Sequence, residues 1–317
     1  MKRVLVVEFS QTGQLSAVLD SLLAPLLAPG SGVTVHRERL RPASAYPFPW
    51  PFWRFLDQFP ETVAQVPVPL APLAVAPDAE FDLVILGYPI WYLSPPPPLT
   101  AFLRSADGAR LLRGKPVVTV TACRNMWMMA QEDVKGMLAE IGARHCDHVA
   151  LVDQGSALAT FITTPRWMWT GRKDPFLGFP PAGITAGQIA GCSRFGAALH
   201  AALAADEERR ARPLLHGLRA CNVDARLIAS EKVGKRSFRI WSKLLRACGR
   251  PGTPLRRAVL ACYLVFLVTI ILTVVPITML LKAALRPLLQ RKLAALQGYF
   301  EQPSGGGEDR LAEFAQP

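Results

Sequence analysis

The 24 residues from Val4 to Leu27, VLVVEFSQTGQLSAVLDSLLAPLL, decide the fold of this chain. Val4–Phe9 is a short apolar run rich in β-branched residues, which predicts a buried strand. The polar loop 10–14 follows, and from Leu15 onward leucine and valine recur at helical spacing. A strand, a polar loop and an amphipathic helix in this order are typical of an α/β fold.

The same alternation continues along residues 1–205. Further strands are predicted at 33–40, 81–87, 116–121 and 148–152, and helices at 98–104, 131–141 and 185–205. Strands this apolar are usually buried on both faces, so we expect a doubly wound, five-stranded parallel sheet. Residues 42–77 interrupt the pattern with nine prolines and seven aromatic residues. This insertion is either a loop with a short helix folded on the core or one wall of an apolar pocket.

The chain has 317 residues, enough for one core plus an appendage. Its net charge of +12 is concentrated in residues 231–292, which hold 13 Lys and Arg residues and one acid. A nucleic-acid surface and a membrane surface would both suit such a basic segment. Residues 206–257 lose strand character, so we expect a basic linker or surface helices there.

An uncharged stretch of 24 residues, 258–281, predicts a transmembrane or membrane-embedded segment. As a helix it would be about 36 Å long at ~1.5 Å per residue, against a hydrocarbon core of roughly 30 Å. Pro276 leaves an in-plane or re-entrant arrangement open. Residues 282–300 are expected to form a basic amphipathic helix and 301–317 a flexible tail. Nine basic residues precede the segment and four follow it, which places the α/β domain on the cytoplasmic face of the inner membrane.

Metal and nucleic-acid partners find little support in the sequence. The six cysteines show no zinc spacing and indicate a reducing compartment. In residues 145–148 (HCDH) all four side chains can ligate a metal, but the run enters a strand, where alternate residues point apart. One short loop at 166–173 interleaves basic and aromatic residues, and a lid or a membrane-facing surface explains it better than nucleic-acid binding. We therefore expect no metal and no nucleic acid.

Three loops should meet where ligands bind in doubly wound sheets, beyond the carboxyl ends of the strands. Loop 10–15 follows the first predicted strand, loop 87–94 the third and loop 121–125 the fourth. The first loop lacks both the Gly-Lys-Ser/Thr of nucleoside-triphosphate loops and the three-glycine dinucleotide fingerprint. Neutral donors before a helix suit a monophosphate, and the aromatic residues of the second loop suit a flat cofactor.

In these loops the chain resembles the flavodoxin-like superfamily over residues 1–205. Ser10-x-Thr12-Gly13 resembles its FMN-phosphate loop, although Leu15 stands where that loop usually ends on threonine. Residues 89–92 and 121–125 resemble the loops that flank the isoalloxazine ring. The resemblance implies FMN as cofactor and the following cofactor-binding residues: Ser10, Gln11, Thr12, Gly13, Gln14, Leu15, Pro89, Ile90, Trp91, Tyr92, Thr121, Ala122, Cys123, Arg124 and Asn125.

A narrower resemblance is to the dialkylresorcinol condensing/aromatising family. It is carried by residues 9–14 (FSQTGQ), 123–127 (CRNMW), 130–132 (AQE) and the late hydrophobic segment. It implies flavin-dependent oxidation of a dialkyl cyclohexanedione to an aromatic resorcinol, with a ketosynthase as partner. The sequence leaves open whether the chain forms a homo-oligomer.

Arg124 and Asn125 are the polar residues of an otherwise apolar loop. Either side chain would stabilise the enolate that forms when the ring is oxidised, or would anchor the flavin and the loop. Tyr92 is a candidate proton relay or a stacking residue. The expected substrate pocket consists of Met126, Trp127, Trp167 and Trp169, whose alternative role is core packing.

Two other functions suit the same features. An FMN-dependent NAD(P)H:quinone reductase would use the same fold and the same membrane segment on a quinone-like substrate. A membrane-tethered electron carrier or binding module without catalysis is the third hypothesis.

Overall fold

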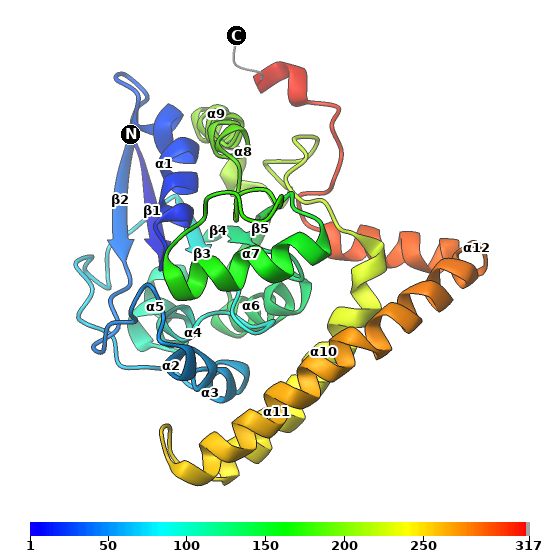
Figure 1. The fold of residues 1–317 in the computed structure, drawn as a ribbon. Helices are drawn as coiled ribbons and strands as arrows, with labels where there is room; N and C mark the ends of the chain where they lie inside the picture. Colours follow the sequence, from blue (N-terminus) through cyan, green and yellow to red (C-terminus); the bar gives the residue numbers. More distant parts are fainter. Residues whose placement is uncertain (315–317) are drawn as a thin grey trace.

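The computed structural model describes residues 1–314, with the side chains of all but residues 157–158, 275–276 and 279–289. Its centre is a five-stranded, fully parallel sheet of order β2-β1-β3-β4-β5 (Figure 1). The strands are β1 (Lys2–Glu8), β2 (Val33–Arg39), β3 (Leu83–Tyr88), β4 (Pro116–Cys123) and β5 (Arg144–Val152). This is the flavodoxin-like strand order, so the predicted fold class is confirmed for the α/β part.

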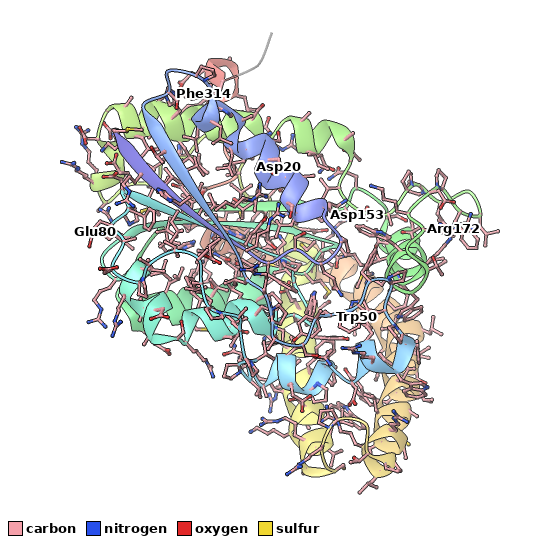
Figure 2. The ribbon with its side chains drawn as sticks, turned by 90° about the vertical axis from the view of Figure 1, so that its left-hand side faces the viewer. Asp20, Trp50, Glu80, Asp153, Arg172 and Phe314 are labelled. Carbon is pink, nitrogen blue, oxygen red and sulfur yellow. The ribbon has the colours of Figure 1, made fainter. Side chains whose placement is uncertain are left out.

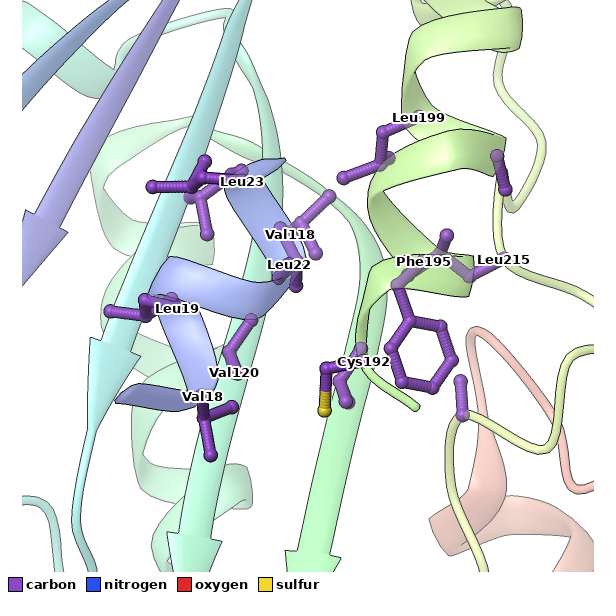
Figure 3. Close-up of a cluster of buried hydrophobic side chains, with 14 of the residues drawn as sticks. Val18, Leu19, Leu22, Leu23, Val118, Val120, Cys192, Phe195, Leu199 and Leu215 are labelled. Atoms are coloured by element: carbon purple, nitrogen blue, oxygen red, sulfur yellow. The ribbon is translucent and has the colours of Figure 1, made fainter. Parts of the chain in front are cut away.

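Helices cover both faces of the sheet. The first face carries α1 (Gln14–Leu27), α8 (Ala186–Ala190) and α9 (Ser193–Ala204), and the second carries α4 (Pro97–Leu103), α5 (Ala106–Leu112) and α6 (Met128–Ile141). Because side chains alternate along a strand, Val4 packs under the first face and Leu5 under the second. Figure 3 shows Leu22 of α1 and Phe195 of α9 in the first core.

Two predicted elements differ most from the structure. Helix 185–205 is divided at Gly191 and Cys192 into α8 and α9. The fifth strand begins at Arg144 rather than at His148, because buried hydrogen bonds neutralise its polar residues. The Asp147 carboxylate, for example, accepts from the N–H groups of Leu214 and Leu215 at 2.7 and 3.1 Å.

The insertion 42–77 folds back onto the core with two short helices, α2 (Phe52–Leu56) and α3 (Phe59–Val63). The Trp50 N–H donates to the Met168 carbonyl of α7 (Ala157–Thr170) at 2.8 Å, so insertion and α7 lie side by side. Both interpretations of the insertion hold: Trp50 is buried in the second core, and Phe59 lines a small apolar cavity.

The C-terminal third forms a helical arm that extends from the α/β domain (Figure 1). After η1 (Glu207–Arg209) come α10 (Ala225–Ala247), α11 (Pro254–Leu272), α12 (Val274–Glu301) and η2 (Leu311–Phe314). The predicted linker 206–257 thus contains a helix of 23 residues.

The predicted membrane segment 258–281 is not one helix, because α11 ends at Leu272 and α12 begins at Val274. Among the described residues, α11 is the one helix long and apolar enough to cross a bilayer. Its first half packs on the protein: Leu260 and Tyr263 are buried, and Arg256 pairs with Asp57 and Glu61 of the insertion. The predictions for the side chains of 279–289, the end of this segment and the start of helix 282–300, lie outside the described residues.

The expectation of a flexible tail is wrong for the part that the structure describes. The Ser304 hydroxyl is fully buried and donates to the Asp147 carboxylate at 2.8 Å. The Gly307 carbonyl accepts from the Arg219 N–H at 2.7 Å. These bonds fix the segment after α12, while residues 315–317 of the predicted tail lie outside the description.

Candidate functional site

The loop after β1 presents unpaired hydrogen-bonding groups. Gly13 has a left-handed φ of 80°, and the Gly13 carbonyl accepts the first helical bond of α1. Among residues 1–314, the N–H groups of residues 10–13 donate to no protein acceptor, and the buried Ser10 Oγ and Gln11 Oε1 have no partner. Buried polar atoms are normally paired, so the N–H groups and the Ser10 hydroxyl, which are donors, give this loop the form of a cradle for an anion at a helix N-terminus, whereas Gln11 Oε1 is an acceptor and would not bind the anion.

Other side chains of the same loop are engaged. Gln11 Nε2 donates to the Pro47 carbonyl at 3.1 Å, and Gln14 Nε2 to the Ile184 carbonyl at 3.4 Å. The Leu15 side chain is 3% exposed and lies in the first core, which corrects its assignment as a cofactor ligand. Leu15 can contribute only its backbone, because a leucine at this step of α1 faces the sheet.

The loop after β3 separates two residues that we expected to act together. Trp91 is buried, with its ring 5.7 Å from those of Phe9 and Trp50. Tyr92 has a φ of 51°, and its hydroxyl donates to the Phe55 carbonyl at 2.6 Å. Burial also raises the pKa of Tyr92 well above its ordinary value. Its predicted roles in proton relay and cofactor binding are therefore wrong, because the left-handed turn directs the ring into the insertion.

The remaining residues of this loop stay near the strand end. Pro89 and Ile90 are half-buried, and Ile90 touches the second core. Their role in flanking a flavin ring stays a prediction.

The loop after β4 holds the candidate charged group. The Arg124 Nε donates to the Thr160 hydroxyl of α7 at 3.0 Å, and the guanidinium lies 4.9 Å from the Phe161 ring centroid. Desolvation lowers the pKa of Arg124, but a guanidinium stays protonated in proteins. Asn125 is half-buried beside it. A fixed cation thus stands at the carboxyl end of a central strand.

The other residues of the loop after β4 are held by contacts within the protein. The Thr121 hydroxyl is buried and donates to the Tyr88 carbonyl at 2.8 Å, so it binds the neighbouring strand rather than a ligand. Ala122 packs in the first core. Cys123 is half-buried, and burial raises the pKa of its thiol, which keeps it protonated.

The four expected pocket residues do not come together. Trp127 is 3% exposed and packs 4.8 Å from His148 in a separate core. Trp167 packs edge-on against Phe48 of the insertion, and the ring of Trp169 lies 5.0 Å from that of Phe52. Met126 stays half-buried in the loop after β4, with a φ of 53°. The two tryptophans of α7 therefore join α7 to the insertion, and the predicted pocket is wrong as a unit.

Asp153 and Trp50, both labelled in Figure 2, were not predicted as site residues. The two oxygens of Asp153 accept from the Gly155 and Gly183 N–H groups at 2.8 and 2.6 Å. A Cβ on Gly183 would lie 2.4 Å from Gln14 Nε2, so Asp153 holds loop 183 against the anion cradle. Asp153 could have been found from the sequence, because it is an acidic residue directly after a predicted strand. Trp50 Nε1 is buried and has no partner among residues 1–314.

Helix α10 positions two site loops through buried charges one turn apart. Lys235 Nζ donates to the Leu93 carbonyl and the Ser94 hydroxyl after β3 at 2.8 and 2.6 Å, and pairs with Asp133 of α6. Glu231 Oε1 accepts from the Met129 N–H at 2.6 Å, at the start of α6 directly after the β4 loop. The sequence predicts a basic linker or surface helices here, because no local pattern pairs this region with the loops.

Residues 145–148 (HCDH) take part in hydrogen bonds inside the protein. His145 and His148 both hydrogen bond to the Thr119 hydroxyl, at 2.9 and 2.8 Å, and burial lowers the pKa of His145 to about 4. Burial raises the pKa of Asp147 to about 6, against the two N–H groups that lower it. The part of the chain that the structure describes shows no cluster of three His, Cys, Asp or Glu residues that could hold a metal.

A hollow of about 460 Å³ lies elsewhere, between Phe81, Arg144 and Arg209. It is an open depression at the amino ends of the strands. Ligands of doubly wound sheets bind at the opposite edge, so we place the site at the loops after β1, β3 and β4.

Comparisons with known proteins find similarity among solved structures alone. No family model matches the chain and no curated protein does. Similar solved structures include a flavoprotein in complex with FMN from Lactobacillus acidophilus NCFM, with 11% identity over 48% of this chain and 93% of that one and a TM-score of 0.38. General stress protein 14 of Treponema denticola, also in complex with FMN, has 12% identity over 63% and 99% and a TM-score of 0.32. An NAD(P)H:quinone oxidoreductase of Methanothermobacter marburgensis has 14% identity over 48% and 83% and a TM-score of 0.25.

The strand order and the geometry of the loop after β1 together define the structural class of this domain. Residues 1–205 form a flavodoxin-like α/β domain with an anion cradle after β1.

Proposed function

We propose that this protein is an FMN-dependent oxidoreductase. The observation that carries the proposal is the set of unpartnered groups on residues 10–13, at the point where the strand order reverses between β1 and β3. Backbone N–H groups and the Ser10 hydroxyl would hold the FMN phosphate, with the α1 dipole adding to the attraction. Pro89–Trp91 and Ala122–Asn125 would flank its ring, and bound FMN would supply hydride transfer.

Arg124 is the residue that we assign to charge stabilisation. Its guanidinium is held by Thr160 and packs on Phe161, so it needs little reorganisation. A fixed cation in a partly desolvated loop stabilises negative charge that develops on a substrate oxygen. Asn125 supplies a neutral donor beside it.

A quinone is the substrate class that we put first. Its reduction by NAD(P)H takes one hydride and one proton and yields the quinol and NAD(P)⁺, with no proton removed from carbon. Aromatisation of a dialkyl cyclohexanedione, made together with a ketosynthase, stays the second candidate, since the long apolar arm would suit its alkyl chains. That reaction needs a proton acceptor, and Tyr92 is bonded to the Phe55 carbonyl instead.

We also propose that the protein works at the cytoplasmic face of a membrane, with its arm lying in the lipid surface. On α11, Val265 and Leu272 are 67% and 69% exposed, and on α10 Ile240 is 60% exposed. Beside them α10 carries an exposed basic stripe at helical spacing: Lys232, Arg236, Arg239 and Lys243. Exposed apolar side chains beside cations suit the surface of an anionic bilayer. An in-plane position leaves the Arg256 ion pairs intact, whereas a full span would break them.

Turnover separates the two substrate classes. Full-length protein loaded with FMN should oxidise NADPH with a soluble quinone, and Arg124→Met should lower kcat/KM about 100-fold, the size seen for one lost oxyanion donor. Arg166→Met removes a guanidinium that pairs with Asp174 outside the site and serves as the control. Oxygen consumption with a dialkyl cyclohexanedione and no nicotinamide would instead select the aromatising reaction. Failure of both reactions would contradict the proposal.

A further inference from the structure

A tight turn with apolar side chains follows the basic and aromatic residues 166–173. The N–H of Phe176 donates to the Phe179 carbonyl at 3.2 Å, and the N–H of Phe179 donates to the Phe176 carbonyl at 2.9 Å. Leu177 and Gly178 form the two-residue connection, and both have a left-handed φ, of 49° and 79°. We call residues 176–179 the apolar turn.

A leucine at position 177 is unfavourable for the protein by itself. Two-residue turns with left-handed φ favour asparagine, aspartate or glycine, because a larger side chain has a steric cost in this conformation. Leu177 is also 79% exposed, so its side chain gains little from packing. A residue that is strained and exposed at once indicates a function outside the folding of the chain.

The apolar turn is fixed to α7 in a defined position. The Arg166 guanidinium donates to the carbonyl and to the carboxylate of Asp174, at 2.9 Å each, and lies 4.6 Å from the Phe176 ring centroid. The Ala182 N–H donates to the Lys173 carbonyl at 3.0 Å and closes the base of the loop. These contacts hold the exposed leucine at the outside of the molecule.

Two tryptophans near this loop are also exposed. Trp169 lies three residues after Arg166 and therefore on the same side of α7. Its ring is 5.0 Å from that of Phe52 in α2, so α7 and α2 are neighbours here. Trp169 is 38% exposed, and Trp53 of α2 is 43% exposed. Tryptophan is enriched where proteins contact the headgroup level of a bilayer.

The charge beside the apolar turn indicates which partner fits. Residues 166–177 contain three cations, Arg166, Arg172 and Lys173, and one acid, Asp174. Arg172 and Lys173 are exposed, and Figure 2 shows Arg172 at the outer edge of the molecule. A second copy of this chain would bring two cationic surfaces together, which is unfavourable. Anionic headgroups above a hydrocarbon layer complement both the cations and the apolar side chains.

We propose that the apolar turn inserts into the surface of an anionic membrane, with Leu177 among the acyl chains and Arg172 and Lys173 at the phosphates. The inference rests on the membrane location proposed above and adds a contact separate from the arm. Helix α7 lies at the carboxyl edge of the sheet (Figure 1), where the Thr160 hydroxyl accepts from Arg124. Insertion therefore holds the flavin loops near the lipid, from which an apolar quinone arrives.

Leu177→Asn tests the proposal, because insertion and folding predict effects of opposite sign. Full-length protein without FMN is sedimented with vesicles of phosphatidylcholine that contain one quarter phosphatidylglycerol. We expect the variant to bind about tenfold more weakly, because one leucine side chain is no longer buried in lipid. Its Tm without vesicles should rise, because asparagine adopts the left-handed turn more easily. Leu27→Asn, at a residue 60% exposed on α1, should bind vesicles as the wild type does.

Lys173→Gln tests the electrostatic part of the contact. It should weaken binding to the same vesicles about fivefold, roughly the effect of one cation near an anionic surface. Binding to vesicles of phosphatidylcholine alone should not change. Arg113→Gln is the matched control, because Arg113 is exposed and precedes β4 at the opposite edge of the sheet.

Unchanged vesicle binding of Leu177→Asn would overturn the proposal. A lower Tm of this variant would do the same, because Leu177 would then serve folding. If vesicle binding is unchanged and the oligomeric state shifts instead, the apolar turn contacts protein and the membrane contact is wrong. FMN is absent from these measurements and Leu272→Glu tests the arm, so failure of this proposal is distinguished from failure of the proposed function.

Discussion

Glu231 should lower the stability of the protein as the pH rises, in opposition to the buried His145 and His148, whose lowered pKa values raise the stability. Its carboxyl group is fully buried, Oε2 has no partner among residues 1–314, and burial raises its pKa from 4.5 to about 7 despite the Met129 N–H that lowers it. The folded state therefore binds this proton more tightly than the unfolded state does. The contribution of Glu231 to stability is fully present below about pH 4.5 and is lost as the pH rises through about 7. This difference in the pKa of Glu231 between the unfolded and folded states corresponds to about 3 kcal/mol of unfolding free energy.

Glu231→Gln tests this reasoning because the amide keeps an oxygen for the Met129 N–H and has no charge. In urea unfolding, the change in unfolding free energy from pH 5 to pH 8 should be more favourable in Glu231→Gln than in the wild type by about 3 kcal/mol, because the variant lacks the loss that Glu231 contributes. Glu140→Gln, at an exposed position of the same helix that Glu231 caps, should keep the wild-type slope. If the unfolding free energy of Glu231→Gln depends on pH as that of the wild type does, Glu231 does not have the role given to it here. Burial of Asp147, whose pKa rises to about 6, adds a smaller slope in all three proteins.

Two further predictions concern the arm. Arg256→Met should destabilise the protein by about 3–5 kcal/mol in urea unfolding, because it leaves two carboxylates without their buried partner, while the exposed Arg257→Met should change it little. Leu272→Glu should reduce co-sedimentation with vesicles that contain anionic lipid at least tenfold, whereas Leu27→Glu, at a residue of similar exposure on α1, should not. Equal stability of the two arginine variants, or equal vesicle binding of the two glutamate variants, would contradict the role given to the arm.

The sheet and the place of the site were predictable because both follow from local patterns. Apolar runs and helical spacing gave all five strands, and the carboxyl ends of parallel strands must share one edge. The loop of residues 10–13 was found in this way, since its polar residues follow the first strand directly. Asp153 offered the same signal after the fifth strand and was missed.

The errors come from contacts that no local pattern reveals. Tyr92 follows Trp91 in the sequence, but a left-handed φ of 51° turns its ring toward the insertion. Trp127 stands in an apolar loop, and only the return of the chain after α10 shows that it is buried there with Phe300. Hydropathy predicted a membrane segment at 258–281, but it could not show that Arg256 anchors the start of α11 to the domain.

Binding of FMN is the central claim, and a titration of the full-length protein followed by its visible spectrum tests it most directly. We expect one FMN per chain with shifted flavin bands. Thr12→Asp should weaken binding at least 30-fold, because a carboxylate in the cradle opposes the phosphate by about 2 kcal/mol or more at short range. Ala24→Asp adds the same charge on the exposed side of α1 and should bind as the wild type does. A wild-type spectrum that remains that of free FMN, or equal affinity of the two aspartate variants, would contradict FMN binding at the loop after β1.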